Sequence, residues 1–223
     1  TSPASYDSFN MQFDFIIPIT GTETTSYIYA GDRYTSFQGG ANPAPTGNGR
    51  NAWMPLTFSG DTPTLHGFSD LTISLATGRL GGNAAANARF ENEGPTQAPS
   101  YWQEWGTTDA MFTQTGGVSG NRLTFWKGST YESYIYQSFT GLRNGTYTLS
   151  IQMLSSGNHD SALLVGKPGG GTEVNTSLNS VANNWVTKTI TFSVTNGAAE
   201  IGLYVDGTAG SWLSIDNVTL TRN

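Results

Sequence analysis

The chain has 223 residues, a net charge of −6 at neutral pH, 12% charged and 12% aromatic side chains, and no cysteine. Without a cluster of Lys and Arg it offers nothing to neutralise a phosphate backbone or an anionic membrane, which excludes nucleic acids and membrane surfaces as partners. The lack of cysteine excludes disulfides and thiol chemistry, and no apolar run approaches the roughly 20 residues of a membrane span.

Many Thr, Ser and Asn residues, together with 28 Gly and 9 Pro, are typical of a β-protein whose surface is rich in hydroxyl and amide groups. We therefore expect a secreted, extracellular protein. No signal peptide is visible, so a secreted protein would have this chain as its mature or internal part. N-glycosylation sequons begin at Asn144, Asn175 and Asn217.

The first 80 residues are predicted to form a small β-sheet. Apolar or aromatic runs bounded by turn residues recur there, at residues 13–19, 25–30, 51–59 and 71–75. Four or five strands make one sheet that buries little apolar surface and leaves its edges unpaired. We therefore expect residues 1–80 to pack on a partner surface, either the rest of the chain, a second copy in a homodimer, or another protein.

A change of composition follows at residues 81–88, with the sequence GGNAAANA. Small residues of this kind are typical of a connection between domains. We therefore expect a linker at 81–88, between a segment 1–80 and a domain 89–223.

The second region alternates apolar with polar residues. Tyr147, Leu149, Ile151 and Met153 alternate with Thr, Ser and Gln, and residues 190–194 and 201–205 repeat the pattern. A period of two over several segments predicts strands with one buried face, arranged as a two-sheet sandwich. Residues 125–150 are predicted as a strand, a hairpin and a strand. The fold class is thus all-β, a sandwich preceded by a small sheet.

Three segments of residues 89–223 are similar to a known family. They are Arg89-Phe90-Glu91 in the expected first strand, residues 123–149, which include Trp126 and Tyr131, and residues 209–220, AGSWLSIDNVTL. On these motifs the region resembles the galactan-binding carbohydrate-binding modules of family 61, which are jelly-roll β-sandwiches. The resemblance implies non-catalytic, lectin-like binding of β-linked galactose.

Sugar recognition needs two kinds of side chain. The apolar face of a pyranose stacks on an aromatic ring, and its hydroxyls need polar donors and acceptors. The candidate sugar-binding residues are the aromatic Trp126, Trp212, Tyr131 and Tyr134 and the polar Lys127, Asn158, Lys167 and Asp206. For each aromatic residue the alternative is a place in the core. Of the neighbouring pair Trp102 and Trp105, we expect Trp105 to pack and Trp102 to be exposed.

Carboxylates on the first and last predicted strands of the sandwich suggest a cation site. Glu91 and Asp216 are expected on the first and last strands, side by side, with Glu93 as a further ligand. Carboxylate and carbonyl oxygens suit Ca²⁺, and the family resemblance implies a structural calcium ion. The alternative is a carboxylate pair without an ion. A sequence with no Cys and two His does not favour a zinc site. His66 is expected at the surface or in packing and His159 in an exposed loop.

The first segment has a resemblance of its own. Tyr6-Asp7-Ser8, residues 27–34 (YIYAGDRY) and residues 51–58 (NAWMPLTF) are similar to the last part of family 43 glycoside hydrolase propellers, in their exo-β-1,3-galactanase branch. That family carries its catalytic carboxylates on earlier blades. A glycosidase needs two carboxylates across the sugar, so no catalytic residue is assigned and this chain alone is not expected to hydrolyse glycosides. The alternatives are a galactanase fragment whose catalytic blades are on a separate chain, and a structural adhesin.

Overall fold

The computed structural model describes residues 11–33 and 50–223. The chain divides into two compact units, Thr1–Ala86 and Asn87–Asn223. The motif Tyr6-Asp7-Ser8 lies outside the described residues. Within them, no helix has the length and apolar character needed to cross a membrane.

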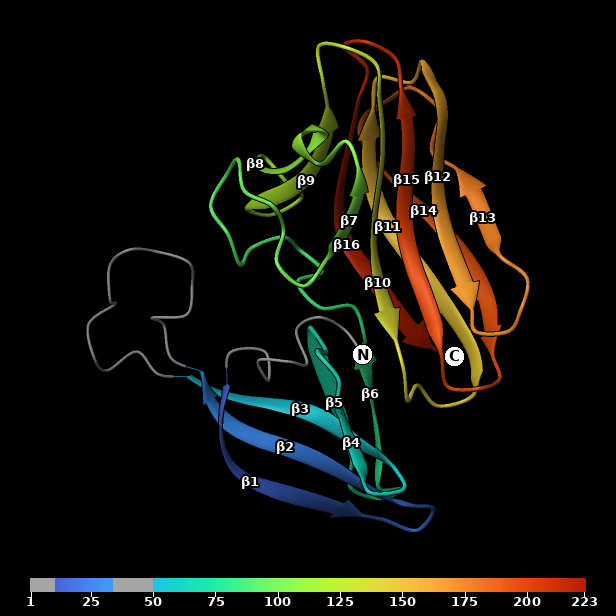
Figure 1. The fold of residues 1–223 in the computed structure, drawn as a ribbon. Coiled ribbons are helices and arrows are strands. Elements are labelled where there is room, and N and C mark those ends of the chain that lie inside the picture. The colour runs from blue at the N-terminus through green and yellow to red at the C-terminus, as the bar shows by residue number, and fades with distance from the viewer. Residues whose placement is uncertain (1–10, 34–49) are drawn as a thin grey trace. The chain divides into compact units, whose positions relative to one another are not determined.

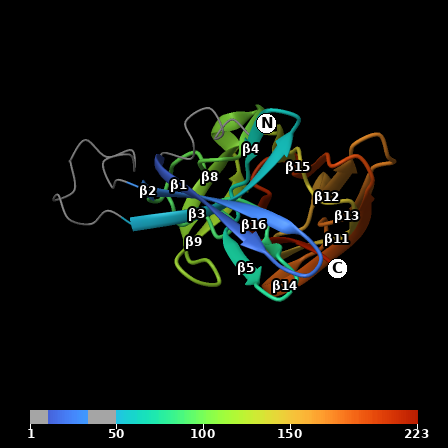
Figure 2. The same ribbon diagram turned by 90° about the horizontal axis from the view of Figure 1, so that it is seen from below.

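The first unit contains a four-stranded antiparallel sheet and a separate hairpin. The sheet has the order β1 (Met11–Thr20), β2 (Thr25–Arg33), β3 (Arg50–Ser59) and β4 (Thr62–Leu65), and the hairpin consists of β5 (Asp70–Ser74) and β6 (Arg79–Asn83). Figures 1 and 2 show the long strands β1, β2 and β3 side by side. The prediction of a small N-terminal β-sheet is confirmed, although the expected strand at 71–75 belongs to the hairpin.

The expected linker at 81–88 is wrong. Residues 81–83 belong to β6 and pair with β5, Ala84, Ala85 and Ala86 are buried, and the boundary between the units falls after Ala86. At Gly82 a Cβ atom would collide with the carbonyl oxygen of Asp70. Small residues here serve close packing of the backbone, which composition alone does not distinguish from flexibility.

The second unit is a sandwich of two five-stranded antiparallel sheets. The front sheet, nearer the viewer in Figure 1, has the order β13 (Val174–Ser177), β12 (His159–Pro168), β15 (Ala199–Gly207), β10 (Tyr131–Phe139) and β7 (Gln103–Gly106). The back sheet has the order β14 (Ala182–Val194), β11 (Gly145–Ser155), β16 (Trp212–Arg222), β9 (Asn121–Trp126) and β8 (Met111–Thr115). The predicted two-sheet β-sandwich is confirmed.

Period-two alternation identified the core correctly. Tyr147, Leu149, Ile151 and Met153 on β11 are buried, and so are Ile201, Leu203 and Val205 on β15. Each of these strands turns its apolar residues toward the other sheet and its polar residues outward, as expected for strands with one solvated face.

The segment at 125–150 is not a hairpin. Strand β9 lies in the back sheet, β10 in the front sheet and β11 again in the back sheet, so the chain crosses between the sheets twice, once before and once after β10. Phe125 at the end of β9 and Tyr131 at the start of β10 are both buried, although their strands lie in different sheets. Alternation predicts such inward positions but does not say which sheet they belong to.

Residues 89–91 do not form an opening strand either. Asn87 and Phe90 have positive φ angles of 44° and 56°, and the Phe90 N–H donates to the Asn87 carbonyl oxygen at 3.2 Å, which closes a turn. Phe90 is fully buried and its ring centroid lies 5.7 Å from that of Trp102. Trp102 is therefore the packing residue, only 8% exposed, whereas Trp105 is 54% exposed, the reverse of the expectation.

Both histidines are buried. His66 Nε2 lies 2.8 Å from Thr57 Oγ1, and burial lowers the pKa of His66 to about 4. The expectation of an exposed His159 is wrong, because the residue is buried at the start of β12, where its N–H also donates to Asn179 Oδ1 at 3.0 Å. Burial lowers the pKa of His159 as well.

Candidate functional site

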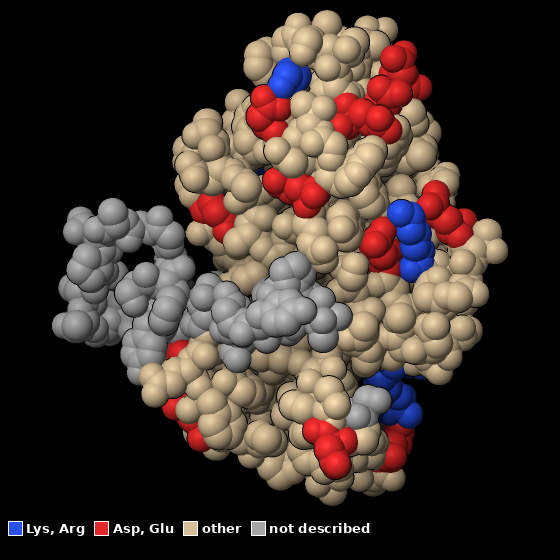
Figure 3. Space-filling model, viewed as in Figure 1, with Lys and Arg blue, Asp and Glu red and all other residues tan. Residues whose placement is uncertain are grey.

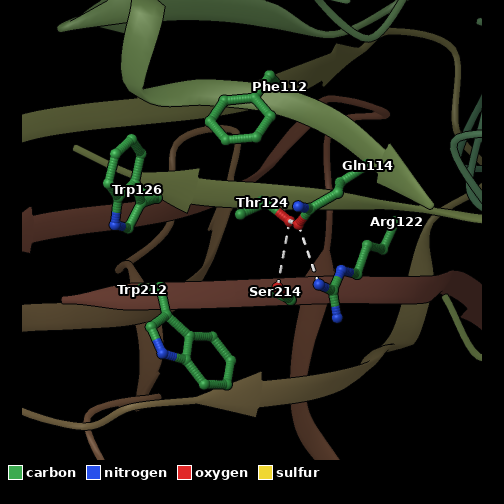
Figure 4. A pocket seen from close by; sticks show the side chains of 7 residues that line it. All are labelled: Phe112, Gln114, Arg122, Thr124, Trp126, Trp212 and Ser214. Atoms are coloured by element: carbon green, nitrogen blue, oxygen red, sulfur yellow. Dashed lines mark hydrogen bonds between the residues drawn. The ribbon is translucent and has the colours of Figure 1, made fainter. Parts of the chain in front are cut away.

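The outer face of the back sheet carries a pocket of about 470 Å³ across strands β8, β9 and β16 (Figure 4). Its lining consists of Phe112, Gln114, Arg122, Thr124, Trp126, Trp212 and Ser214. The volume lies within the range of small-molecule sites.

Strand register brings the two tryptophans together. Trp212 on β16 pairs with Trp126 on β9, and two residues along, Ser214 pairs with Thr124. The intervening Leu213 and Phe125 are fully buried in the core, so alternation turns both indoles outward. Trp126 is 48% exposed and Trp212 half-buried. Figure 4 shows the indoles at one end of the pocket.

The other end of the pocket is polar. Gln114 Oε1 accepts hydrogen bonds from Arg122 Nη2 at 2.9 Å and from Thr124 Oγ1 at 3.1 Å, and Thr124 Oγ1 lies 3.2 Å from Ser214 Oγ. Arg122 Nε is buried and finds no hydrogen-bond partner among the described residues. Burial also lowers the pKa of the Arg122 guanidinium. Because Nε is out of reach of solvent, the guanidinium can meet a pocket ligand only through its Nη groups, of which Nη2 is held by Gln114.

Two predicted site residues, Lys127 and Asn158, lie at the end of the sandwich near this pocket but do not line it. Lys127 follows Trp126, and its Nζ is paired with Asp109 Oδ2 at 2.5 Å. Asn158, with φ 60°, donates from Nδ2 to Thr208 Oγ1 at 3.4 Å. Both side chains therefore already have protein partners.

The prediction of Tyr131 as a stacking residue is wrong. The side chain is 3% exposed, and its hydroxyl donates to the Ser211 carbonyl oxygen at 3.3 Å. A Cβ atom at Gly207 would collide with the Tyr131 ring, so the glycine makes room for it. Tyr131 shares the inward face of β10 with Ile135, which leaves no ring surface for a sugar.

The remaining candidates lie on the outer face of the front sheet, away from the pocket. Tyr134 donates from its hydroxyl to Glu200 Oε1 at 2.7 Å, and Lys167 Nζ lies 3.1 Å from the same oxygen and 4.6 Å from the centre of the Tyr134 ring. Asp206 is on β15, and Lys167 lies within β12 and not in a turn. The eight predicted residues thus divide between two faces and the core.

Five residues of the pocket were not predicted from sequence. They are Phe112, Gln114, Arg122, Thr124 and Ser214. A signal was present, because Arg122, Thr124 and Trp126 follow each other at intervals of two, as do Trp212 and Ser214, and such residues share one face of a strand. Which strands lie side by side was not visible in the sequence.

The predicted cation site is a pair of carboxylates around the loop 117–121. Asp216, fully buried on β16, accepts from the Val118 N–H at 2.7 Å and from the Asn217 N–H at 2.6 Å. Glu91, which is not on a strand, accepts from the Asn121 N–H at 3.0 Å. Burial and, to a smaller extent, the charge of Glu91 raise the pKa of Asp216, against backbone N–H groups that lower it.

Glycines let this loop approach both carboxylates. A Cβ at Gly120, where φ is 61°, would collide with the Glu91 carboxylate, and one at Gly117 would lie 2.7 Å from Asp216 Oδ2. Glu93 accepts from Asn87 Nδ2 at 3.0 Å. Across residues 11–33 and 50–223 no three His, Cys, Asp or Glu side chains gather, so a cation here would need main-chain carbonyl oxygens besides the two carboxylates. Such hard oxygen donors fit Ca²⁺.

Comparisons with known proteins support the fold of the second unit. No family model and no curated protein sequence matches the chain. A solved family 61 carbohydrate-binding module in complex with β-1,4-galactotriose aligns with 63% of this chain and 99% of that chain, at 23% identity and a TM-score of 0.56. A family 16 carbohydrate-binding module aligns with 60% of this chain and 96% of that chain, at 19% identity and a TM-score of 0.46.

An exo-β-1,3-galactanase from Phanerochaete chrysosporium, solved with β-1,3-galactotriose, aligns with 98% of this chain at 16% identity. The alignment spans only 45% of that enzyme, and the TM-score of 0.35 is too low to establish a shared arrangement. The family 61 module, to which the motifs of the second region pointed, is thus found among the similar structures. At 23% identity the comparison establishes the fold alone, and residues 87–223 share the β-sandwich fold of the family 61 module.

Proposed function

We propose that this protein is a secreted, non-catalytic carbohydrate-binding protein that holds β-linked galactose in the pocket of the back sheet. The observation that carries the proposal is the pairing of Trp126 with Trp212 at one end of a pocket whose other end is lined by Arg122 and Gln114. Indole faces attract the polarised C–H groups of a pyranose, and the guanidinium donates to its hydroxyls.

Galactose suits such a site because its axial O4 leaves a continuous C–H surface from C3 to C6 on one face of the ring. The sandwich has the fold of a module that was solved with β-1,4-galactotriose, which supports the same class of ligand. The pocket lining is neutral apart from Arg122, in keeping with an uncharged glycan.

The lining also favours binding over hydrolysis. Glycosidases act through two carboxylates that flank the scissile bond, and the pocket is lined by Phe, Gln, Arg, Thr, Trp and Ser side chains.

A second candidate is the C-terminal part of a family 43-type exo-β-1,3-galactanase whose catalytic blades are on another chain. It is favoured by the exposed aromatic side chains of the first sheet, such as Phe15 and Trp53, which a neighbouring blade would cover.

We further propose that Glu91 and Asp216 bind a structural calcium ion, with Glu93 close by and main-chain carbonyl oxygens completing the ligand set. A divalent cation would offset the repulsion between two carboxylates that both accept N–H groups of the loop 117–121. The ion would link the irregular segment around Glu91 to strand β16, at the centre of the back sheet.

The ligand is tested by isothermal titration of the full chain with galactose, β-1,3- and β-1,4-galacto-oligosaccharides, and a β-glucan oligosaccharide of equal length. We expect saturable binding of the galacto-oligosaccharides and none of the glucan. Absence of binding to every galactoside would contradict the proposal. Release of sugar from a galactan by the chain alone would contradict both candidates, because the second has its catalytic blades on another chain.

A further inference from the structure

We infer that the sandwich has a second glycan-binding surface, centred on Trp105 on the outer face of the front sheet, which takes another segment of a neutral β-galactan. This inference rests on the proposed function, because it assigns the same class of ligand to a different face. It is carried by the exposure of Trp105 and by the fixed tyrosines and polar groups of the strands next to β7.

Trp105 is exposed in a way that a packing residue is not. It lies on the edge strand β7, pairs with Tyr134 of β10, and is 54% exposed. Within the described sandwich, the large hydrophobic side chains that stand out from the surface are Trp105, Val118, Trp126, Val181 and Val186. Only two of these are aromatic. One is in the pocket of the back sheet, and the other is Trp105.

Beside Trp105 the surface is rigid. The rings of Tyr134 and Tyr136 stack with centroids 5.1 Å apart and planes 13° from parallel. Tyr134 lies over Gly202, where a Cβ atom would collide with the ring, and its hydroxyl is held by Glu200 at 2.7 Å. A sugar on Trp105 would therefore meet a wall that loses little side-chain freedom on binding.

Polar groups suited to sugar hydroxyls lie next to this wall. Tyr204, which pairs with Tyr134, donates to Glu132 Oε1 at 2.8 Å. Burial, followed by the hydrogen bond to Glu132, raises the pKa of Tyr204 to about 12, so the phenol remains protonated at physiological pH. The Glu132 carbonyl oxygen accepts from the Thr107 N–H at 2.8 Å, which fixes Glu132 beside the end of β7. That bond holds the Glu132 main chain beside β7, and the hydrogen bond from Tyr204 orients its carboxylate toward β15, on the other side of β10 from Trp105. The carboxylate is thus an oriented acceptor beside the tyrosine wall.

The acidic side chains of this surface favour a neutral ligand. The outward positions of β10 and β15 include Glu132, Glu200 and Asp206, and Lys167 is already paired with Glu200. Figure 3, viewed with the front sheet toward the reader, shows more acidic than basic side chains over the sandwich. An acidic polysaccharide or a nucleic acid would be repelled, whereas a neutral polyol would find an aromatic face and carboxylate acceptors.

The two surfaces cannot be reached by one short oligosaccharide. They are on the outer faces of sheets that pack about 10 Å apart and point in opposite directions. Occupation of both therefore requires two chains or two distant segments of one polymer, and a protein with both would bridge galactan chains and gain avidity on a polymer.

The test uses the full chain labelled with 5-fluorotryptophan, whose six ¹⁹F resonances are assigned with single Trp→Phe variants. It is titrated with β-1,4-galactotriose and, separately, with a glucan trisaccharide. We expect saturable shifts of Trp126 and Trp212, and of Trp105 at about tenfold higher concentration, because an open sheet encloses less of a sugar than a pocket. Trp53, 49% exposed on the first sheet, is the matched control and should not respond.

The outcomes separate the two proposals. Shifts of Trp126 without Trp105 overturn the second surface and leave the pocket standing. Shifts of Trp105 alone support the second surface and contradict the pocket, and no shift at either site contradicts both. A Trp105 shift that is linear, shared with Trp53 or equal for the glucan is nonspecific and also overturns the inference. On insoluble galactan, Trp105→Ala should reduce retention severalfold with galactotriose affinity at the pocket unchanged, and unchanged retention would oppose it.

Discussion

The N-terminal sheet and the sandwich are built from the same kind of strand but differ in what covers the strands. In the sandwich each sheet buries the apolar side of the other. In the first sheet Phe15 and Trp53 both pair with Ala30 on one face, while Tyr27 and Phe58 meet edge to face on the other, and all four rings remain substantially exposed. Alternation shows that a strand has apolar positions; it does not show what buries them.

The sharpest test of this difference is a matched pair of truncations. Phe125→Ala in the sandwich core should lower the free energy of unfolding by about 3–5 kcal/mol, because it removes a fully buried ring and leaves a cavity. Phe15→Ala, at a 55% exposed position, should cost less than about 1 kcal/mol. Urea denaturation followed by circular dichroism measures both. Equal losses would mean that the first sheet is covered in solution.

A second test uses the buried histidine of the first unit. His66 has a pKa of about 4 in the folded protein against 6.5 when unfolded, so between these values the unfolded state binds more protons and the stability rises with pH. Lowering the pH from 7 to 4 should therefore cost the first unit about 3 kcal/mol. His66→Gln should remove this dependence and leave that of His159, in the sandwich. Parallel pH profiles of variant and wild type would contradict the assignment.

Removal of calcium should affect the stability of the two units differently. A chelator should lower the unfolding temperature of the sandwich and leave that of the first unit unchanged. The free energy of unfolding of the sandwich should fall by about 3 kcal/mol if the ion is present at a hundredfold its dissociation constant. Asp216→Asn should abolish the chelator effect, whereas Glu173→Gln, an exposed carboxylate in a loop, should retain it. An unchanged melting curve of the wild type in excess chelator would show that Glu91 and Asp216 hold no ion.

Much of the sandwich was predictable because its signals are local. The alternation in β11 and β15 gave the buried residues correctly, and the resemblance to family 61 modules gave the two-sheet architecture. Trp126 and Trp212 were identified by residue type, since indoles are favoured for stacking on sugars.

The rest depends on contacts between distant residues. Tyr131 and Tyr134 look alike in sequence, yet one faces the core and the other the solvent, because the inward parity of β10 is set by packing. The exchange of Trp102 and Trp105 has the same origin, since Trp102 is buried against Phe90, which follows a turn that the sequence did not reveal. The contact of Arg122 with Gln114 was missed because Gln114 comes from β8, a neighbouring strand that the sequence did not identify.

The central claim is that the pocket between Trp126 and Trp212 binds the glycan. It is tested most directly by titrating galactotriose into the Trp126→Ala/Trp212→Ala variant, with Trp53→Ala as a control of the same residue type and similar exposure. Loss of aromatic stacking should weaken binding by about 1–3 kcal/mol for each ring, which is at least tenfold in affinity, while the control binds as the wild type does. Full affinity in the double variant, with its fold intact by circular dichroism, would contradict the account.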